Sequence, residues 1–94
     1  MLMLLQLSMP SFLVLSWVVK PGEAVSFRPA HHEYMTTLKS TGKMEAGYRF
    51  VDGKGGVYIL QAASEDDARR IADADPYHKN GIREYTLTAV EKRY

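Results

Sequence analysis

Two short segments carry residue types that can exchange protons with a ligand. Asp75 precedes Pro76 at the end of an alanine-rich segment, and His31 follows a proline in the segment 28–32. A proline disfavours helical dihedral angles in the residue before it, so we expect Asp75 at a bend with its carboxylate turned sideways. An imidazole acts as a general base or acid when a carboxylate fixes its tautomer. If the fold brings the two segments together, His31 and Asp75 form a candidate catalytic dyad.

The same residues also have a purely structural interpretation. A histidine at a helix start can cap or pack, and an aspartate before a proline can be a turn residue only. The neighbouring His32 points about 100° around a helix from His31, and we expect it to face solvent or an interface. No ligand-type side chain stands four positions after either histidine, so we predict no metal site.

Four further side chains are candidates for binding a small molecule. We predict that Arg28, Tyr34, Tyr48 and Tyr77 contact the substrate. Arg28 can hold an anionic group or pair with a carboxylate, and the sequence leaves both open. Tyr77 directly follows the Asp-Pro bend, so its hydroxyl is expected to reach the same cavity. Aromatic residues at strand or helix spacing in so small a protein also serve as core, and this alternative stays open.

The hydrophobic pattern predicts the elements that position these residues. Strands are expected at residues 12–19, 43–51, 57–62 and 83–91, from apolar runs and from alternation of apolar and polar residues. Helices are expected from Pro29 to about Ser40 and from Ser64 to Asp75. Residues 21–27 are predicted to be a connector and residues 77–81 a polar loop. The order strand, helix, strand, strand, helix, strand is that of a ferredoxin-like α+β domain with an antiparallel sheet.

Length and composition limit the class of protein. A chain of 94 residues with 46% hydrophobic content builds one small domain with a thin core, and a second copy can cover an apolar sheet face, so we expect a homodimer. The net charge of +1 gives no electrostatic footprint for nucleic acid or an anionic membrane. The absence of cysteine excludes thiolate catalysis and fits a cytoplasmic protein.

The first eleven residues need a separate interpretation. They are apolar, but no basic region precedes them and Pro10 interrupts the apolar run before it is long enough to span a bilayer. We therefore expect residues 1–11 to be an N-terminal extension, neither a signal peptide nor a membrane segment, and residues 12–94 to form the single domain.

Several segments together resemble the YCII-related family across residues 12–94. They are Arg28-Pro29-Ala30-His31, Gly42 with Ala46-Gly47, the helix start at Ser64, and above all Ala72-Asp73-Ala74-Asp75-Pro76-Tyr77 followed by Gly81. The resemblance implies a ferredoxin-like fold that dimerises through its sheets into a dimeric α+β barrel. It also implies an active site built on a histidine and an aspartate, which map onto His31 and Asp75. This chain departs from many relatives in carrying Tyr48 where they have a proline.

The family includes a dehydrochlorinase that eliminates chloride from a chlorinated hydroxyquinol during aromatic compound degradation. The resulting hypothesis is a lyase that needs no cofactor and that removes HCl from a small hydroxylated ring by acid/base catalysis. Two alternatives stay open. One is an isomerase like the muconolactone isomerases, which are related dimeric barrels, and the other is a non-catalytic barrel that binds a small metabolite.

Overall fold

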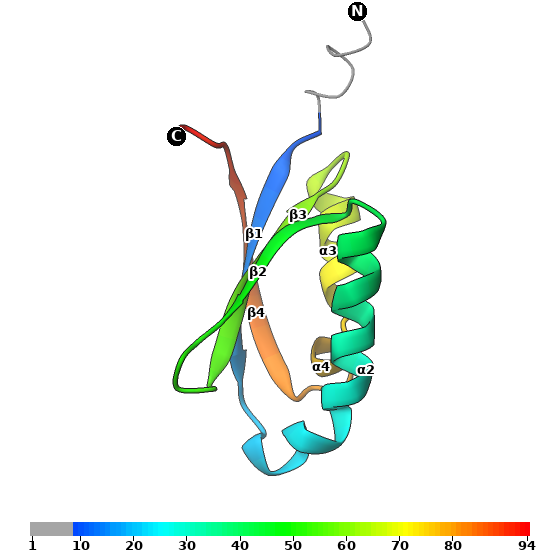
Figure 1. The fold of residues 1–94 in the computed structure, drawn as a ribbon, viewed down its shortest axis with the longest axis vertical. Coiled ribbons are helices and arrows are strands. Elements are labelled where there is room, and N and C mark those ends of the chain that lie inside the picture. The colour runs from blue at the N-terminus through cyan, green and yellow to red at the C-terminus, as the bar shows by residue number, and fades with distance from the viewer. Residues whose placement is uncertain (1–8) are drawn as a thin grey trace, which may run out of the picture.

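The structure, a computed structural model, describes residues 9–94. These residues form one antiparallel sheet with the helices on one of its faces (Figure 1). The strands are β1 (Ser11–Val18), β2 (Met44–Arg49), β3 (Gly55–Gln61) and β4 (Arg83–Val90). The helices are α2 (Pro21–Ser40), α3 (Glu65–Asp73) and the short α4 (Pro76–Lys79). The predicted order of strands and long helices is confirmed.

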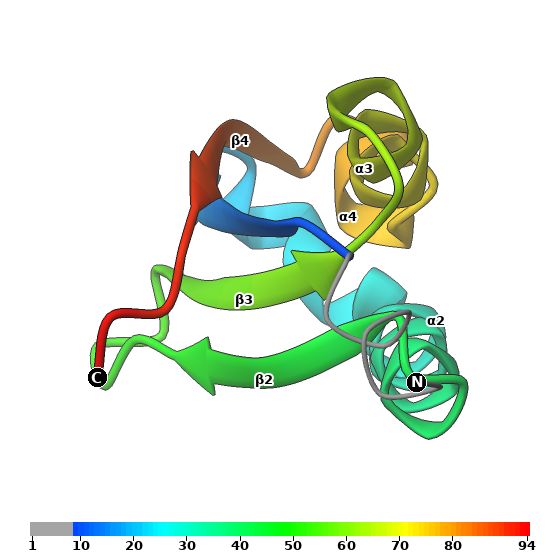
Figure 2. The ribbon, with the colours of Figure 1, turned by 90° about the horizontal axis from the view of Figure 1, so that it is seen from above.

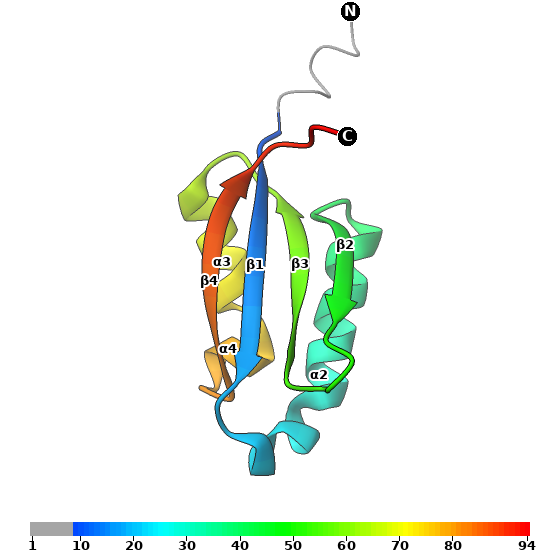
Figure 3. The same cartoon turned by 90° about the vertical axis from the view of Figure 1, so that its left-hand side faces the viewer.

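The strands lie in the order β2-β3-β1-β4, which Figure 3 shows from the face without helices. Strand β1 is central and pairs with both β3 and β4, so that Val14 lies opposite Tyr58 on one side and Leu87 on the other. This is the strand order of the ferredoxin-like fold. The predicted α+β class is confirmed.

The core lies between the sheet and the helices. Figure 2 shows α3 and α4 beside β1 and β4, and α2 on the side of β2 and β3. Alternate residues of each central strand face the helices because side chains alternate between the faces of a sheet. The buried apolar residues include Phe12, Val14, Tyr58, Leu60, Leu38, Ala68 and Ala72. The alanines of α3 allow that helix to pack closely on the sheet.

The opposite face of the sheet carries apolar side chains that none of the helices within residues 9–94 covers. Leu13 and Leu15 of β1 pair there with Ile59 and Val57 of β3, and Leu15 is 37% exposed. An uncovered apolar face of this kind is what the expected homodimer requires. Dimerisation through the sheets stays a prediction.

The prediction that the first helix begins at Pro29 is wrong. Helix α2 begins at Pro21 and contains Pro29 in its interior. A proline in the first turn loses no hydrogen bond, because the N–H groups there have no partner within the helix. Pro29 does remove an internal bond, and Figure 1 shows the first turns of α2 at an angle to the rest. Residues 21–27 are therefore helical, although a connector was expected.

The prediction of a polar loop at residues 77–81 is also wrong for residues 77–79, which belong to α4. Helix α3 ends at Asp73, and α4 begins three positions later at Pro76. Asp75 is the N-cap of α4, because its side chain accepts a hydrogen bond from the backbone N–H of Tyr77. An aspartate N-cap followed by proline is a strong helix start. The Asp-Pro pair that stops one helix thus starts the next.

The expected N-terminal extension lies outside the described residues up to residue 8, and Ser11 already belongs to β1. Within the described part of the chain, none of the helices is both long enough and apolar enough to cross a membrane.

Candidate functional site

The fold brings together the two residues of the candidate dyad. His31 lies in the second half of α2 and Asp75 at the start of α4, and the distance from His31 Nδ1 to Asp75 Oδ1 is 2.8 Å. The pair lies where α2 crosses α4, two helices that pack against each other on the same face of the sheet. Residues 44 positions apart in the sequence therefore share a hydrogen bond.

Asp75 is held by donors on both carboxylate oxygens. Oδ1 accepts from the N–H of Tyr77 at 3.0 Å, and Oδ2 accepts from the hydroxyl of Tyr58 at 3.2 Å. The side chain is 1% exposed. Burial acts to raise the pKa of Asp75, but the hydrogen bond from His31, the positive charges that His31 and His78 carry when they are protonated, and the Tyr77 N–H together hold that pKa below its usual value. Asp75 is therefore an ionised acceptor at neutral pH.

An ionised Asp75 fixes the tautomer of His31. A carboxylate only accepts hydrogen bonds, so Nδ1 of His31 carries the proton and donates it, and Nε2 of the neutral ring is free to accept one. The ring of His31 also stacks on Tyr77, with centroids 4.3 Å apart and an interplanar angle of 27°. Its side chain is 19% exposed. Hydrogen bond and stacking together orient the imidazole while leaving part of it accessible.

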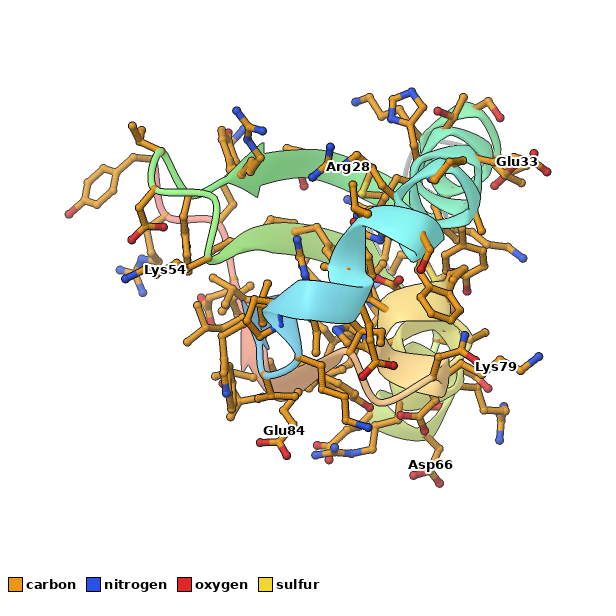
Figure 4. All side chains as sticks on the ribbon, turned by 90° about the horizontal axis from the view of Figure 1, so that it is seen from below. Arg28, Glu33, Lys54, Asp66, Lys79 and Glu84 are labelled. Atoms are coloured by element: carbon orange, nitrogen blue, oxygen red, sulfur yellow. The ribbon has the colours of Figure 1, made fainter. Side chains whose placement is uncertain are left out.

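The accessible part of His31 lines a pocket of about 610 Å³ between α2 and the strands β2 and β3. Arg28, Tyr48 and Tyr77 line the same pocket, together with Tyr58 and Arg83. Figure 4 shows Arg28 between α2 and the green strand β2. The volume lies in the range typical of small-molecule sites. Three of the four predicted binding residues therefore surround one cavity with His31.

Tyr48 reaches the pocket from an unexpected direction. The strand expected at residues 43–51 was predicted from alternation of apolar and polar residues, which would place Tyr48 on the same buried face as Met44, but Tyr48 is 68% exposed. The pairing of β2 with β3 shifts between Met44 and Ala46, where one extra residue breaks the alternation. Beyond this shift Tyr48 pairs with Val57 and shares its face of the sheet, the face without helices, so Tyr48 borders the pocket without belonging to the core.

The fourth predicted binding residue, Tyr34, does not line the pocket. It packs against the core, and its hydroxyl donates a 2.7 Å hydrogen bond to the carbonyl of Ile71. Burial and the nearby charge of Asp75 raise the pKa of Tyr34. Tyr34 thus joins α2 to α3. Its position fits the alternative in which the aromatic residues serve as core.

The glycines of β3 form part of the pocket wall. Gly55 and Gly56 are buried, and a Cβ atom on either would collide with a backbone carbonyl oxygen, that of Ser16 for Gly55 and that of Tyr48 for Gly56. These two positions lie between the strands expected at residues 43–51 and 57–62, and the structure adds them to the start of β3. The absence of side chains at both lets the neighbouring strands lie close together.

A second histidine, His78, lies beside Asp75 and was not among the predicted site residues. The distance from His78 Nδ1 to Asp75 Oδ2 is 3.9 Å, and the His78 side chain is 3% exposed. Its Nδ1 donates to the carbonyl of Ala72 at 2.7 Å, and its Nε2 accepts from the Ser16 hydroxyl at 2.8 Å. Burial lowers the pKa of His78, against the opposing effects of Ala72 and Asp75. His78 is therefore neutral, and both its nitrogens have partners within the chain.

Tyr58 and Arg83 were also missed as site residues. Tyr58 donates to Asp75, and the guanidinium carbon of Arg83 lies 4.4 Å from the centroid of the Tyr77 ring. Burial, followed by the Asp75 charge and hydrogen bond, raises the pKa of Tyr58, so its hydroxyl stays protonated. Arg83 begins β4 and Tyr58 lies within β3. Their spacing in the sequence does not indicate a functional site. The spacing of three between Asp75 and His78 would have been informative had α4 been expected.

A smaller hollow of about 380 Å³ lies beside the pocket, and Arg83 belongs to both. Trp17, His78 and Tyr85 line it together with Asp73 and Glu84. Among residues 9–94, no three histidine or acidic side chains gather in a way that could hold a metal ion.

Comparisons with known proteins agree with this fold. The 5-chloro-2-hydroxyhydroquinone dehydrochlorinase from Burkholderia phenoliruptrix, solved in complex with 2,5-dihydroxybenzoquinone, has a similar structure with a TM-score of 0.73 at 22% sequence identity. The similarity covers 86% of this chain and 93% of that one, and at this identity it shows the fold.

Sequence comparisons give the family. The uncharacterized protein YjpA from Bacillus subtilis is 32% identical over 57 residues, which are 61% of this chain and 67% of that protein. The sequence profile of the YCII-related domain matches residues 3–91, almost the whole chain. This chain therefore belongs to the YCII-related family.

Proposed function

We propose that this protein is a lyase that eliminates HCl from a small chlorinated, hydroxylated aromatic ring, with His31 as its general base. The observation that carries the proposal is the 2.8 Å hydrogen bond between His31 and a buried, ionised Asp75, at the wall of a pocket large enough for a small aromatic molecule. The structural likeness to a dehydrochlorinase that binds a dihydroxybenzoquinone supports the choice of substrate class.

The reaction balances without a cofactor. A proton moves from a ring hydroxyl to the chlorinated carbon and gives a keto tautomer. Nε2 of His31 then takes the proton of a second hydroxyl, the electron pair of that O–H bond enters the ring, and chloride leaves from the carbon. The hydroquinone part of the ring is oxidised to a quinone while the carbon that carried chlorine is reduced, so that only H⁺ and Cl⁻ are lost.

Each neighbour of His31 has a defined part in this scheme. Asp75 holds Nδ1 protonated and stabilises the imidazolium that forms when Nε2 takes the proton. Tyr77 stacks on the imidazole and keeps its plane fixed. A positioned general base contributes about 10²- to 10⁴-fold in rate, and orientation of the ring in the pocket supplies the remainder.

The test is chloride release from 5-chloro-2-hydroxyhydroquinone under anaerobic conditions, followed together with quinone absorbance. We expect release by the wild type and a loss of about 10²- to 10⁴-fold in His31→Ala and Asp75→Asn. Glu33→Ala is the control, because Glu33 neighbours the site on α2 but is exposed and points away from the pocket (Figure 4).

Two outcomes would overturn parts of the proposal. Full activity in both His31→Ala and Asp75→Asn would remove the pair from the mechanism. A folded wild type that releases no chloride would exclude HCl elimination from this ring. Isomerisation or binding of a small metabolite by the same pocket would then be the alternatives to test.

A further inference from the structure

The charged side chains around the main pocket are all basic. The lining includes Arg28, Lys39, Arg49 and Arg83 as well as His31 and His32, and the described residues contribute neither aspartate nor glutamate to it. The chain as a whole has 12 basic and 11 acidic residues, so this imbalance is local. Figure 4 shows Glu33, Asp66 and Glu84 on the outside of the domain, away from Arg28. The lining of the pocket is therefore enriched in positive charge in a nearly neutral protein, and the ionised Asp75 lies behind His31 rather than in the lining.

Arg83 differs from the other three cations of the pocket. Arg28 and Arg49 are exposed to solvent, and the Lys39 ammonium donates to the carbonyl of Glu45 at 2.6 Å. Arg83 is partly buried, and its Nε is fully buried without a hydrogen-bond partner among the described residues. Asp73 and Glu84 line the neighbouring hollow, yet no ion pair within residues 9–94 includes Arg83. Arg83 thus lacks the counterion that a half-buried guanidinium normally has.

A half-buried cation without an ion pair and a buried donor without a hydrogen bond are unfavourable, because burial has removed them from water and the Tyr77 ring offsets only part of the lost hydration. A guanidinium matches the geometry of a carboxylate or of two neighbouring oxyanions, to which it can donate two hydrogen bonds. Arg83 lies over Tyr77, and Tyr77 stacks on His31. His31, Tyr77 and Arg83 line the same pocket, so a ligand there can contact Arg83 and the proposed base together.

We propose that Arg83 binds an anionic oxygen of the ligand, so that the pocket selects ring compounds that carry a phenolate or carboxylate over their neutral counterparts. This inference rests on the proposed function in taking the pocket as the substrate site, and it adds the charge state of the substrate. One ring oxygen is bound as an anion by Arg83, while His31 takes the proton of another.

The test compares an anionic and a neutral probe by calorimetry at pH 7. The anionic probe is 2,5-dihydroxybenzoquinone, whose hydroxyls are vinylogous carboxylic acids, and the neutral probe is 2,5-dimethoxybenzoquinone. The variants are Arg83→Met, which keeps length and apolar bulk, and Arg83→Lys, which keeps the charge without the Nε donor. Arg70→Met is the matched control, because it removes one positive charge from the exposed face of α3, where Arg70 pairs with Asp67.

We expect the wild type and Arg70→Met to bind the anion at least tenfold more tightly than the neutral probe. Arg83→Met should weaken binding of the anion by roughly 10- to 100-fold, the effect of one charge-assisted hydrogen bond, and change binding of the neutral probe by less than about twofold. Equal binding of the two probes by the wild type, or undiminished binding of the anion by Arg83→Met, would overturn the inference.

Two further observations keep the test decisive. If circular dichroism shows that Arg83→Met is unfolded, Arg83→Lys decides, with a several-fold loss for the anion expected and no loss contradicting the inference. Chloride release has no part in these measurements. If the protein selects the anion but releases no chloride, the proposed reaction is wrong and the inference about Arg83 stands. If it releases chloride without preferring the anion, the proposed reaction stands and the inference about Arg83 is wrong.

Discussion

Two histidines flank the same buried carboxylate, and their surroundings differ in every other respect. His31 uses one nitrogen to bind Asp75, and its 19% exposed ring borders the pocket. His78 is 3% exposed, and both its nitrogens are bound, one to the Ala72 carbonyl and one to the Ser16 hydroxyl. Proximity to a carboxylate therefore does not identify a base. What distinguishes His31 is that its second nitrogen has no partner among residues 9–94 and that its ring lies at a cavity wall.

The largest difference between the two histidines should appear when each is replaced by glutamine. His31→Gln is expected to reduce turnover by about 10²- to 10⁴-fold and to change the free energy of unfolding by about 1 kcal/mol or less. His78→Gln should lower the free energy of unfolding by about 1–3 kcal/mol, because it leaves buried polar groups without good partners, and reduce turnover less than tenfold. Urea denaturation and chloride release measure both effects. The reverse pattern would make His78 the functional histidine.

A smaller effect distinguishes the histidines by pH. The pKa of the buried His78 lies below its ordinary value of 6.5. At pH values between the folded pKa and 6.5, the unfolded chain therefore binds a proton that the native chain does not. The stabilisation is complete above pH 6.5 and is lost as the pH falls. We expect the free energy of unfolding to decrease from pH 7 to pH 5 in the wild type, and to decrease less in His78→Gln. Urea denaturation at several pH values measures this, and equal slopes would contradict it.

The carboxylate of Asp75 affects stability in a different pH range from His78. The pKa of Asp75 is held below its ordinary value of 3.8, so its own contribution is complete above that value and is lost only at more acidic pH. A decrease in stability between pH 7 and pH 5 therefore does not come from Asp75.

The smallest effect concerns the hydroxyl that supports Asp75. Tyr58→Phe removes the donor to Oδ2 and is expected to lower the free energy of unfolding by about 0.5–1.5 kcal/mol. Turnover should fall by roughly 2- to 10-fold, because the carboxylate that orients His31 is less well held. Denaturation and chloride release are again the measurements.

Tyr34→Phe is the matched comparison, because it also loses one hydroxyl hydrogen bond, the partly buried bond to the Ile71 carbonyl. It should lose stability to a similar extent without the fall in turnover. An equal fall in turnover would restore Tyr34 to the substrate-binding residues that the sequence predicted.

The elements could be predicted from the sequence where local patterns decide the structure. Alternation in β4 and the cap at Ser64, whose hydroxyl accepts from the N–H of Asp67, are local features, and both are present. The start of α2 was misjudged because two prolines eight residues apart each fit the first turn of a helix. Residues 21–27, the first part of α2, are helical, and Ala24 and Phe27 in this part are half-buried.

The site was predictable only in part, for the same reason. The Asp-Pro-Tyr segment and the histidine after a proline are visible in the sequence, and the structure places His31 and Asp75 in contact. The partners of that pair are not visible. Tyr58 and Arg83 lie in regular strands. They belong to the site because the packing of the helices on the sheet brings Asp75 and Tyr77 into contact with them. No local pattern contains this information, since it depends on contacts between residues distant in the sequence.

The position of Asp75 as the N-cap of α4 has a consequence for conformational entropy. Its carboxylate is held by a backbone amide and a buried hydroxyl before any ligand arrives. The torsional freedom of this side chain is therefore lost when the chain folds, and none remains to be lost when a ligand binds. The imidazole of His31 inherits this order through its hydrogen bond, so the rigidity of the site comes from the first turn of a helix only four residues long.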